Sequence, residues 1–279
     1  AQMAGLNVLR LLNEPTAAGL AYNLQEKPDN TRFLIYDLGG GTFDVSILDY
    51  FDGVVQVSAS AGDNHLGGED FLQALKHCFL QRCTELSKSD IEKLNLQKDI
   101  WQPLEIAKRQ LSQESEVDIS INFEGKEYKA RITREDFQQA SSVLFSRLRQ
   151  PLERALRDAR LNPEQIDGII LVGGATRMPM ISRSIVQLFK KIPQLGVNPD
   201  EAIARGAAIQ AALIFRNQHL DEVILTDVMP FSLGTDTSIN LGNGRMSHGH
   251  FSPIIERNMP VPVSRSKNFV TALDNQTEI

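Results

Sequence analysis

The sequence predicts an α/β fold, because strand-like runs occur early in the chain and strand–glycine–helix units occur late. Three apolar or alternating runs, at 32–38, 42–50 and 53–61, are typical of β-strands. The buried run at 168–172 then leads through glycines into a helical pattern, which is the order of elements in an α/β protein. A length of 279 residues and a hydrophobic content of 42 % allow a substantial core.

The helices are predicted from caps and periodicity. Pro15, preceded by the polar residues Asn13 and Glu14, is typical of a helix start, so a helix is expected at 15–24. Two short strands at 117–123 and 127–132 flank a turn and are predicted to form a hairpin. Further helices are expected from 67 to about 86, then to about 112, from about 133 to 161 with a kink or restart at Pro151, at about 178–190, and from 198 to about 219.

The chain changes character after residue 219. A short apolar strip, Val223, Ile224 and Leu225, lies between acids, and proline, glycine and β-branched residues follow it without helical periodicity. We therefore predict a linker at about 221–229 and a new β-rich module from Pro230. Because both ends of the sequence interrupt a pattern, we expect this chain to be a fragment of a longer protein.

Composition excludes some classes of function. A net charge of −6 and a pI near 5.5 argue against a nucleic-acid partner, which needs a basic surface. The sequence has no run of eighteen apolar residues and no visible secretory signal, so we expect no membrane association. Cys78 and Cys83 have neither metal-site nor disulfide spacing, and free thiols of this kind predict a cytoplasmic protein.

The segment from Asp37 to Asp44 is the most informative stretch. Gly39, Gly40 and Gly41 join two predicted strands, and three adjacent glycines allow backbone N–H groups to converge on an anion such as a phosphate. The flanking carboxylates supply hard oxygens for a cation or its water. This combination predicts a nucleotide polyphosphate with its metal, although such a glycine run can also be a plain hairpin turn.

Two further glycine pairs extend this hypothesis. Gly67–Gly68 and Gly173–Gly174 each precede a helical pattern, and the second pair follows a buried strand. The N-terminus of a helix presents N–H groups and a positive dipole end to an anion. Glycine turns could therefore clamp a polyphosphate from opposite sides, which would explain why no P-loop lysine motif occurs in the sequence.

A helical face could bind the rest of a nucleotide. Glu105, Lys108 and Ser112 share one face by their spacing, with Arg109 beside them. These side chains could line a cleft for a ribose or base edge, or they could form an ordinary solvated surface with an ion pair. Arg177 could likewise stack its guanidinium on a base or remain at the surface.

Six motifs then follow one another in order: NEPTAA at 13–18, DLGGGTFD at 37–44, GDNHLGGEDF at 62–71, VGGATR at 172–177, NPDEA at 198–202 and DVMPFSLG at 227–234. With these motifs the chain resembles the 70-kDa heat-shock-protein family, the DnaK-type chaperones, over essentially its whole length. The segment 251–258 resembles the bacterial HscC-like branch in particular.

The resemblance implies an actin-like (ribonuclease H-like) ATPase domain. Residues 1–220 would form the second lobe of the nucleotide-binding domain, with a helical and β subdomain at about 67–139. Residues 221–229 would be the interdomain linker, and 230–279 the start of a peptide-binding β domain. The implied cofactors are ATP or ADP, Mg²⁺ and K⁺. The implied partners are a J-domain co-chaperone, extended peptide clients and a nucleotide exchange factor.

Site roles follow from the resemblance position by position. The phosphates would contact Gly39, Gly40, Gly41 and Thr42, while Asp37, Asp44 and Glu14 would order the cation and the attacking water. The adenosine pocket would comprise Glu105, Lys108, Arg109 and Ser112, closed by Gly173, Gly174, Arg177 and Asp200. The hinge would comprise Gly67, Gly68 and Glu69, the co-chaperone surface Arg10, Asn13 and Thr16, and the linker Val223, Ile224, Leu225 and Asp227.

Two departures and one expected omission limit this transfer. Ala175 stands where the family usually has serine, and Thr226 replaces the last apolar residue of the usual linker strip. The expected fragment lacks the first lobe, with its own phosphate loop and lysine. Since phosphoryl transfer needs charge stabilisation from all sides, we expect weak binding and little hydrolysis by this chain alone.

The sequence therefore predicts part of a chaperone that hydrolyses ATP to switch its affinity for hydrophobic peptides. A sugar kinase of the same fold is one alternative, and the linker motif with the β-rich tail argues against it. A non-enzymatic protein that binds nucleotide as a structural plug is a second alternative. The presence of both acids, Asp37 and Asp44, favours a protein that hydrolyses nucleotide over one that only binds it.

Overall fold

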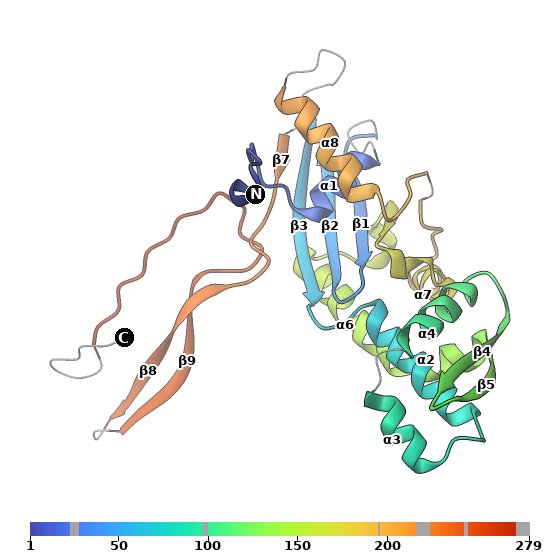
Figure 1. Cartoon of the computed structure of the whole chain (residues 1–279). Coiled ribbons are helices and arrows are strands. Elements are labelled where there is room, and N and C mark those ends of the chain that lie inside the picture. Colours follow the sequence, from blue (N-terminus) through green and yellow to red (C-terminus); the bar gives the residue numbers. More distant parts are fainter. Residues whose placement is uncertain (23–27, 97–99, 195, 216–223, 243–244, 272–279) are drawn as a thin grey trace.

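The structure is a computed structural model, and it describes residues 1–22, 28–96, 100–194, 196–215, 224–242 and 245–271. Figure 1 shows an α/β body built on one twisted sheet, a smaller helical and β unit beside it, and a long hairpin that projects away from the body. In the part of the chain that the structure describes, no helix is long and apolar enough to cross a membrane.

The body is a five-stranded sheet with the order β6-β1-β2-β3-β7. Three consecutive strands, β1 (Thr31–Leu38), β2 (Phe43–Phe51) and β3 (Val54–Asp63), pair antiparallel as a meander. At the two edges, β6 (Gly168–Val172) is parallel to β1 and β7 (Ile224–Thr226) is parallel to β3. The mixed sheet confirms the predicted α/β class and four of these strands to within two residues.

Helices cover both faces of the sheet because its strands are apolar on both sides. Phe33 and Ile35 of β1 pack toward α1 (Glu14–Ala21) and α8 (Ala202–Ile214). Leu34 and Tyr36 alternate with them and pack toward α6 (Ser142–Ala159) and α7 (Pro179–Phe189). The first pair of helices lies over the near face of the sheet in Figure 1. Short 3₁₀ turns occur at η1 (Gln2–Ala4), η3 (Pro163–Gln165) and η4 (Gly174–Arg177).

The smaller unit runs from α2 to α5. It comprises α2 (Gly68–Arg82), α3 (Lys88–Leu96), α4 (Trp101–Gln110), the hairpin strands β4 (Glu116–Phe123) and β5 (Lys126–Thr133), and α5 (Arg134–Ala140). The buried residues of β4 alternate strictly, so one face of the hairpin packs against the helices. Positive φ at Glu124 and Gly125 forms the tight turn that the sequence predicts there.

Two helical predictions were wrong in detail. The segment from 87 to 112 contains two helices, α3 and α4, rather than one. The long helix after Thr133 is interrupted at Ser141, whose backbone is not helical, and it continues through Pro151. Proline in a helix interior costs stability, but Pro151 is buried within the core-facing stripe of α6, and this packing offsets the loss. The expected end of the last helix, near 219, lies outside the described residues.

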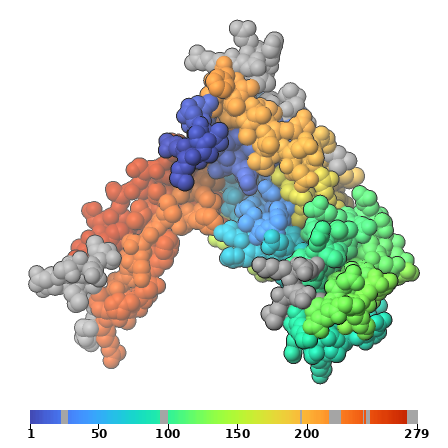
Figure 2. All heavy atoms as spheres, viewed as in Figure 1, coloured from blue at the N-terminus to red at the C-terminus, as the bar shows by residue number. Residues whose placement is uncertain are grey.

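The C-terminal part contains one hairpin, β8 (Leu233–Gly242) and β9 (Arg245–Ile255), paired only with each other among the described strands. Figure 2 shows it as an arm separate from the main body. Large apolar side chains such as Phe231, Leu241 and Phe251 are exposed along it. The strands predicted after residue 230 are therefore present, among the described residues, as one two-stranded hairpin.

Candidate functional site

The turn between β1 and β2 is hydrogen-bonded to the first residues of α2. The Gly39 amide donates to the Thr42 carbonyl at 3.0 Å, which closes the turn. The amides of Gly68 and Glu69 donate to the carbonyls of Gly39 and Gly40 at 2.9 and 2.8 Å. These bonds occupy the loop carbonyls and leave its remaining amides available to an anion.

Gly67 is required by this contact. A Cβ atom at Gly67 would lie 2.3 Å from the Gly40 carbonyl oxygen, so any larger residue would push the start of α2 away from the turn. The glycine turn at 39–41 and the pair Gly67–Gly68 therefore pack directly against each other.

The third glycine site adjoins these two. Gly173 has φ +84 and lies against β1, where a Cβ would be 2.3 Å from the Leu38 carbonyl oxygen. The helix expected at about 178–190 is present as α7, which begins at Pro179, and η4 lies between it and the glycines. The residues directly after the glycines are therefore not the first turn of the α-helix itself. A short 3₁₀ turn takes that place.

These glycine turns line one large cavity of about 970 Å³. Of the predicted site residues, eleven line it: Gly39, Gly40, Gly68, Glu69, Glu105, Lys108, Arg109, Ser112, Gly174, Arg177 and Asp200. The remaining wall comprises Leu72, Trp101, Gln102, Gln113, Ala175 and Met178. Most of that second group was missed by the sequence analysis. Trp101 could have been predicted from the sequence, because it lies four residues before Glu105 and therefore on the same helix face.

The α4 face carries an ion-pair network within the cavity wall. Glu105 receives Lys108 Nζ at 2.7 Å and Arg109 Nε at 2.9 Å, as the spacing predicts. Burial acts to raise the pKa of Glu105, but hydrogen bonds from both cations outweigh it and hold the pKa below its usual range. Lys108 is only 11 % exposed and also donates to the Gly68 carbonyl at 3.1 Å, so this face is not simply solvated.

The opposite wall is fixed by Arg177. Its Nη2 donates to Asp200 Oδ2 at 2.8 Å and to Asn198 Oδ1 at 2.5 Å. This anchors a planar, half-exposed guanidinium at the cavity wall, where it can stack on a flat ligand.

A second cavity, of about 240 Å³, is lined by the predicted acidic residues. Glu14, Asp37, Asp44 and Asp227 line it together with Asn13. Burial, with a smaller contribution from the charges of Glu14 and Asp44, raises the pKa of Asp37 to about 7. Burial and the charge of Glu14 likewise raise the pKa of Asp44.

The three carboxylates suit a cation held through water. Their mutual repulsion favours a bound positive charge, which would reverse the pKa shifts. Among the described residues, however, no three acidic, histidine or cysteine side chains converge as a direct ligand set. Mg²⁺ keeps several waters when it binds protein carboxylates, so the acid cluster fits such an ion without enclosing it.

The other predicted site residues lie around these cavities. Gly41 and Thr42 are exposed at the tip of the turn, and Arg10 is exposed ahead of α1. The buried Thr16 hydroxyl donates to Asp227 Oδ1 at 2.5 Å, which ties α1 to the segment after β7. Ile224 and Leu225 form β7 against Val54 and Val55 of β3, and Val223 lies outside the described residues.

A mixed sheet with helices on both faces and glycine turns at one large cleft is consistent with the fold class of actin-like ATPase domains. The family model described as Hsp70 protein matches residues 1–279. The chaperone protein DnaK of Thermosipho africanus is 45 % identical over 287 residues, covering 99 % of this chain and 46 % of the relative. The DnaK of Thermotoga neapolitana is 44 % identical over 288 residues, covering 99 % and 47 %.

The chain therefore belongs to the Hsp70 family. It spans about half the length of the curated relatives it matches. The HscC-like branch is not shown by these relatives, and that finer assignment stays a prediction.

Proposed function

We propose that this chain is part of an ATP-dependent molecular chaperone and carries nucleotide-binding residues, a linker and the start of a peptide-binding domain. The observation that carries the proposal is the single 970 Å³ cavity between the glycine turns, the α4 face and Arg177. Its volume lies in the range of small-molecule sites, about 300–1,000 Å³. The glycine amides would bind the phosphates, and the α4 face and Arg177 would bind the adenosine.

The hydrolytic role rests on the acid cluster. Asp37 and Asp44 pair across β1 and β2 directly beside the glycine turn, with Glu14 within electrostatic range. We infer that these residues orient a water for in-line attack on the terminal phosphate and accept its proton, with Thr42 near the attacked phosphorus. Mg²⁺, when bound, would neutralise phosphate charge, and K⁺ would add to this field.

The proposed linker includes β7, and the pairing of β7 with β3 supports a coupling role. Three residues of β7 extend the sheet beyond β3, and Arg257 pairs with Asp158 of α6 where both are about one-fifth exposed. Asn258 Oδ1 accepts a bond from the Ser60 amide at 3.2 Å. An edge strand held by so few contacts can dock in one nucleotide state and detach in the other.

Partners follow as proposals of the same kind. Arg10, Asn13 and Thr16 precede or begin α1. The Thr16 hydroxyl bonds to Asp227 of the proposed linker, so a J-domain co-chaperone bound to this surface would sense the linker. The clients would be extended hydrophobic peptides bound by the β domain, and a nucleotide exchange factor would act on the cleft. We place the protein in the cytoplasm, where two buried free cysteines remain reduced.

Glu105→Ala is expected to weaken binding of Mg-ADP about tenfold, because it removes a carboxylate fixed by two cations in the cavity wall. Trp101 is the only tryptophan of the chain and lines the same cavity, so its fluorescence reports binding directly. Glu153→Ala is the matched control, since Glu153 forms the same kind of i,i+4 pair with Arg149 outside the cavity. An affinity equal to wild type would remove the α4 face from the site, and no response of wild type up to millimolar Mg-ADP would overturn nucleotide binding by this chain.

Asp158→Asn is expected to speed amide exchange at 224–226 by about threefold to tenfold, because it removes the partly buried charge partner of Arg257. Hydrogen-exchange mass spectrometry checks this, with Glu153→Gln on the same helix as control. Unchanged protection of β7 would show that this ion pair does not hold the linker.

A further inference from the structure

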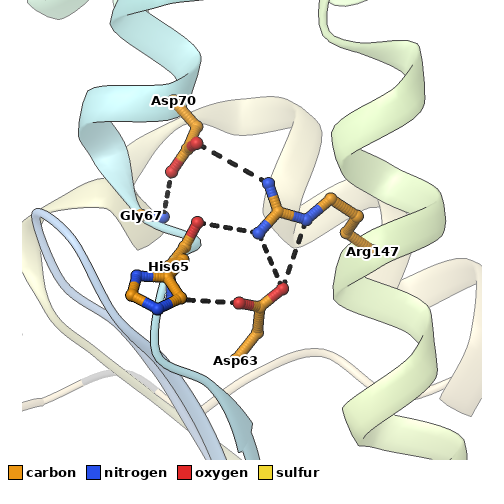
Figure 3. Close-up of polar contacts among 5 residues, drawn as sticks. All are labelled: Asp63, His65, Gly67, Asp70 and Arg147. Carbon is orange, nitrogen blue, oxygen red and sulfur yellow. Dashed lines mark hydrogen bonds and ion pairs between the residues drawn. The ribbon is translucent and has the colours of Figure 1, made fainter.

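An arginine outside both cavities connects α6 to the loop between β3 and α2. Arg147 Nη2 donates to Asp63 Oδ2 at 2.8 Å and to the His65 carbonyl at 2.7 Å, and Nε donates to Asp63 at 3.2 Å. Its Nη1 lies 3.6 Å from Asp70 Oδ1 in the first turn of α2. Figure 3 shows the guanidinium between the two carboxylates, facing the His65 carbonyl.

Asp63 and Asp70 each also accept a hydrogen bond from a backbone amide of the same loop. Asp63 Oδ1 accepts the His65 amide at 3.0 Å, and Asp70 Oδ2 accepts the Gly67 amide at 2.8 Å. Burial acts to raise the pKa of Asp63, but the His65 amide and Arg147 outweigh it and lower the pKa. The two carboxylates are thus shared between one guanidinium and the loop backbone.

The β3–α2 loop that Arg147 holds packs against the Gly39–Gly41 turn. Two residues after His65, Gly67 packs against the Gly40 carbonyl, and the next two amides bond to the Gly39 and Gly40 carbonyls. A shift of this loop therefore moves the turn that would bind the phosphates. It also changes how the smaller α2–α5 unit is joined to the sheet, since β3 ends at Asp63 and α2 begins at Gly68.

We propose that Arg147 is a positioning residue for the nucleotide site: by clamping Asp63, Asp70 and the His65 carbonyl, it fixes the β3–α2 connection and so holds the Gly39–Gly41 turn in its binding conformation. Nε and Nη2 both donate to Asp63 Oδ2, and Nη2 also donates to the His65 carbonyl. This arrangement requires arginine, because a lysine ammonium cannot span these acceptors in one plane. The effect on nucleotide rests on the proposed function, whereas the clamp itself does not.

Arg147→Gln and Arg147→Lys test the clamp in this chain. We expect amide exchange of residues 65–70 and 39–42 to accelerate about tenfold in the glutamine variant, and less in the lysine variant, while exchange in β4 and β5 stays at the wild-type rate. Arg149→Gln is the control, because Arg149 pairs with Glu153 on the exposed side of the same helix, away from the loop. Equal exchange of the loop in all variants, or acceleration everywhere at once, overturns the proposal.

Affinity for Mg-ADP, followed by Trp101 fluorescence, completes the test. We expect about a tenfold loss in Arg147→Gln with partial recovery in Arg147→Lys. Asp63→Asn gives a milder variant should the glutamine protein fail to fold, and it should show the same local loss of protection. If wild type binds no nucleotide but the exchange result holds, the proposed function fails while the clamp stands. If wild type binds and Arg147→Gln binds equally well, Arg147 does not position the site.

Discussion

Gly206→Ala is expected to destabilise the protein by about 3 kcal/mol or more, the largest effect of any single substitution considered. A Cβ atom at Gly206 would lie 1.8 Å from the carbonyl oxygen of Ala17, in the backbone of the facing helix. Neither backbone can yield without separating α1 from α8. Because α1 begins at Glu14 and carries Thr16, this separation would also disturb the acid cluster and the bond to Asp227.

The sign of this effect distinguishes packing from local propensity. Glycine in a helix interior is less favourable than alanine by about 1 kcal/mol, so propensity alone predicts that Gly206→Ala stabilises α8. Urea unfolding, followed by circular dichroism, measures which term prevails. An unchanged or raised midpoint would show that α1 and α8 are further apart in solution than the structure has them.

The sheet was predictable because its signals are local. The apolar runs of β1 and β6 and the alternation of β3 each specify a strand without reference to the rest of the fold. The glycine run at 39–41 and the pair at 67–68 likewise indicated turns, and the motif order identified the family. The face of Glu105 and Lys108 followed from helical spacing, which is also local.

What the sequence did not reveal depends on contacts between distant segments. Arg147 is 84 residues from Asp63, and nothing in its own helix pattern separates it from the other arginines of α6. The interruption at Ser141 rather than Pro151 reflects how α6 packs on the sheet, which overrides proline's local preference. Trp101 was not predicted for a different reason: a tryptophan on a helix more often packs in the core than lines a cavity.

Asp37→Asn is expected to remove most of the loss of stability that the wild-type chain suffers as the pH rises from about 4 to about 7. The ordinary pKa of an aspartate is near 3.8, and in the fold that of Asp37 is raised to about 7 by burial and by Glu14 and Asp44. In the interval between these two pKa values, the native state therefore holds a proton that the unfolded chain has already released. Stability falls as pH rises through it, and it levels off above pH 7.

We expect this loss to be about 1–2 kcal/mol, well below the full shift, because Asp37 is partly accessible to solvent that screens its charge. Urea unfolding at half-unit pH steps in a chelator measures it for wild type, for Asp37→Asn, and for Asp236→Asn as an exposed control in β8. Millimolar Mg²⁺ should restore the wild-type chain at pH 8 and leave Asp37→Asn unchanged, because a cation compensates only a charge that is present. Parallel pH profiles for wild type and Asp37→Asn would contradict the raised pKa, and a Mg²⁺ effect of equal size in both would remove Asp37 from the cation site.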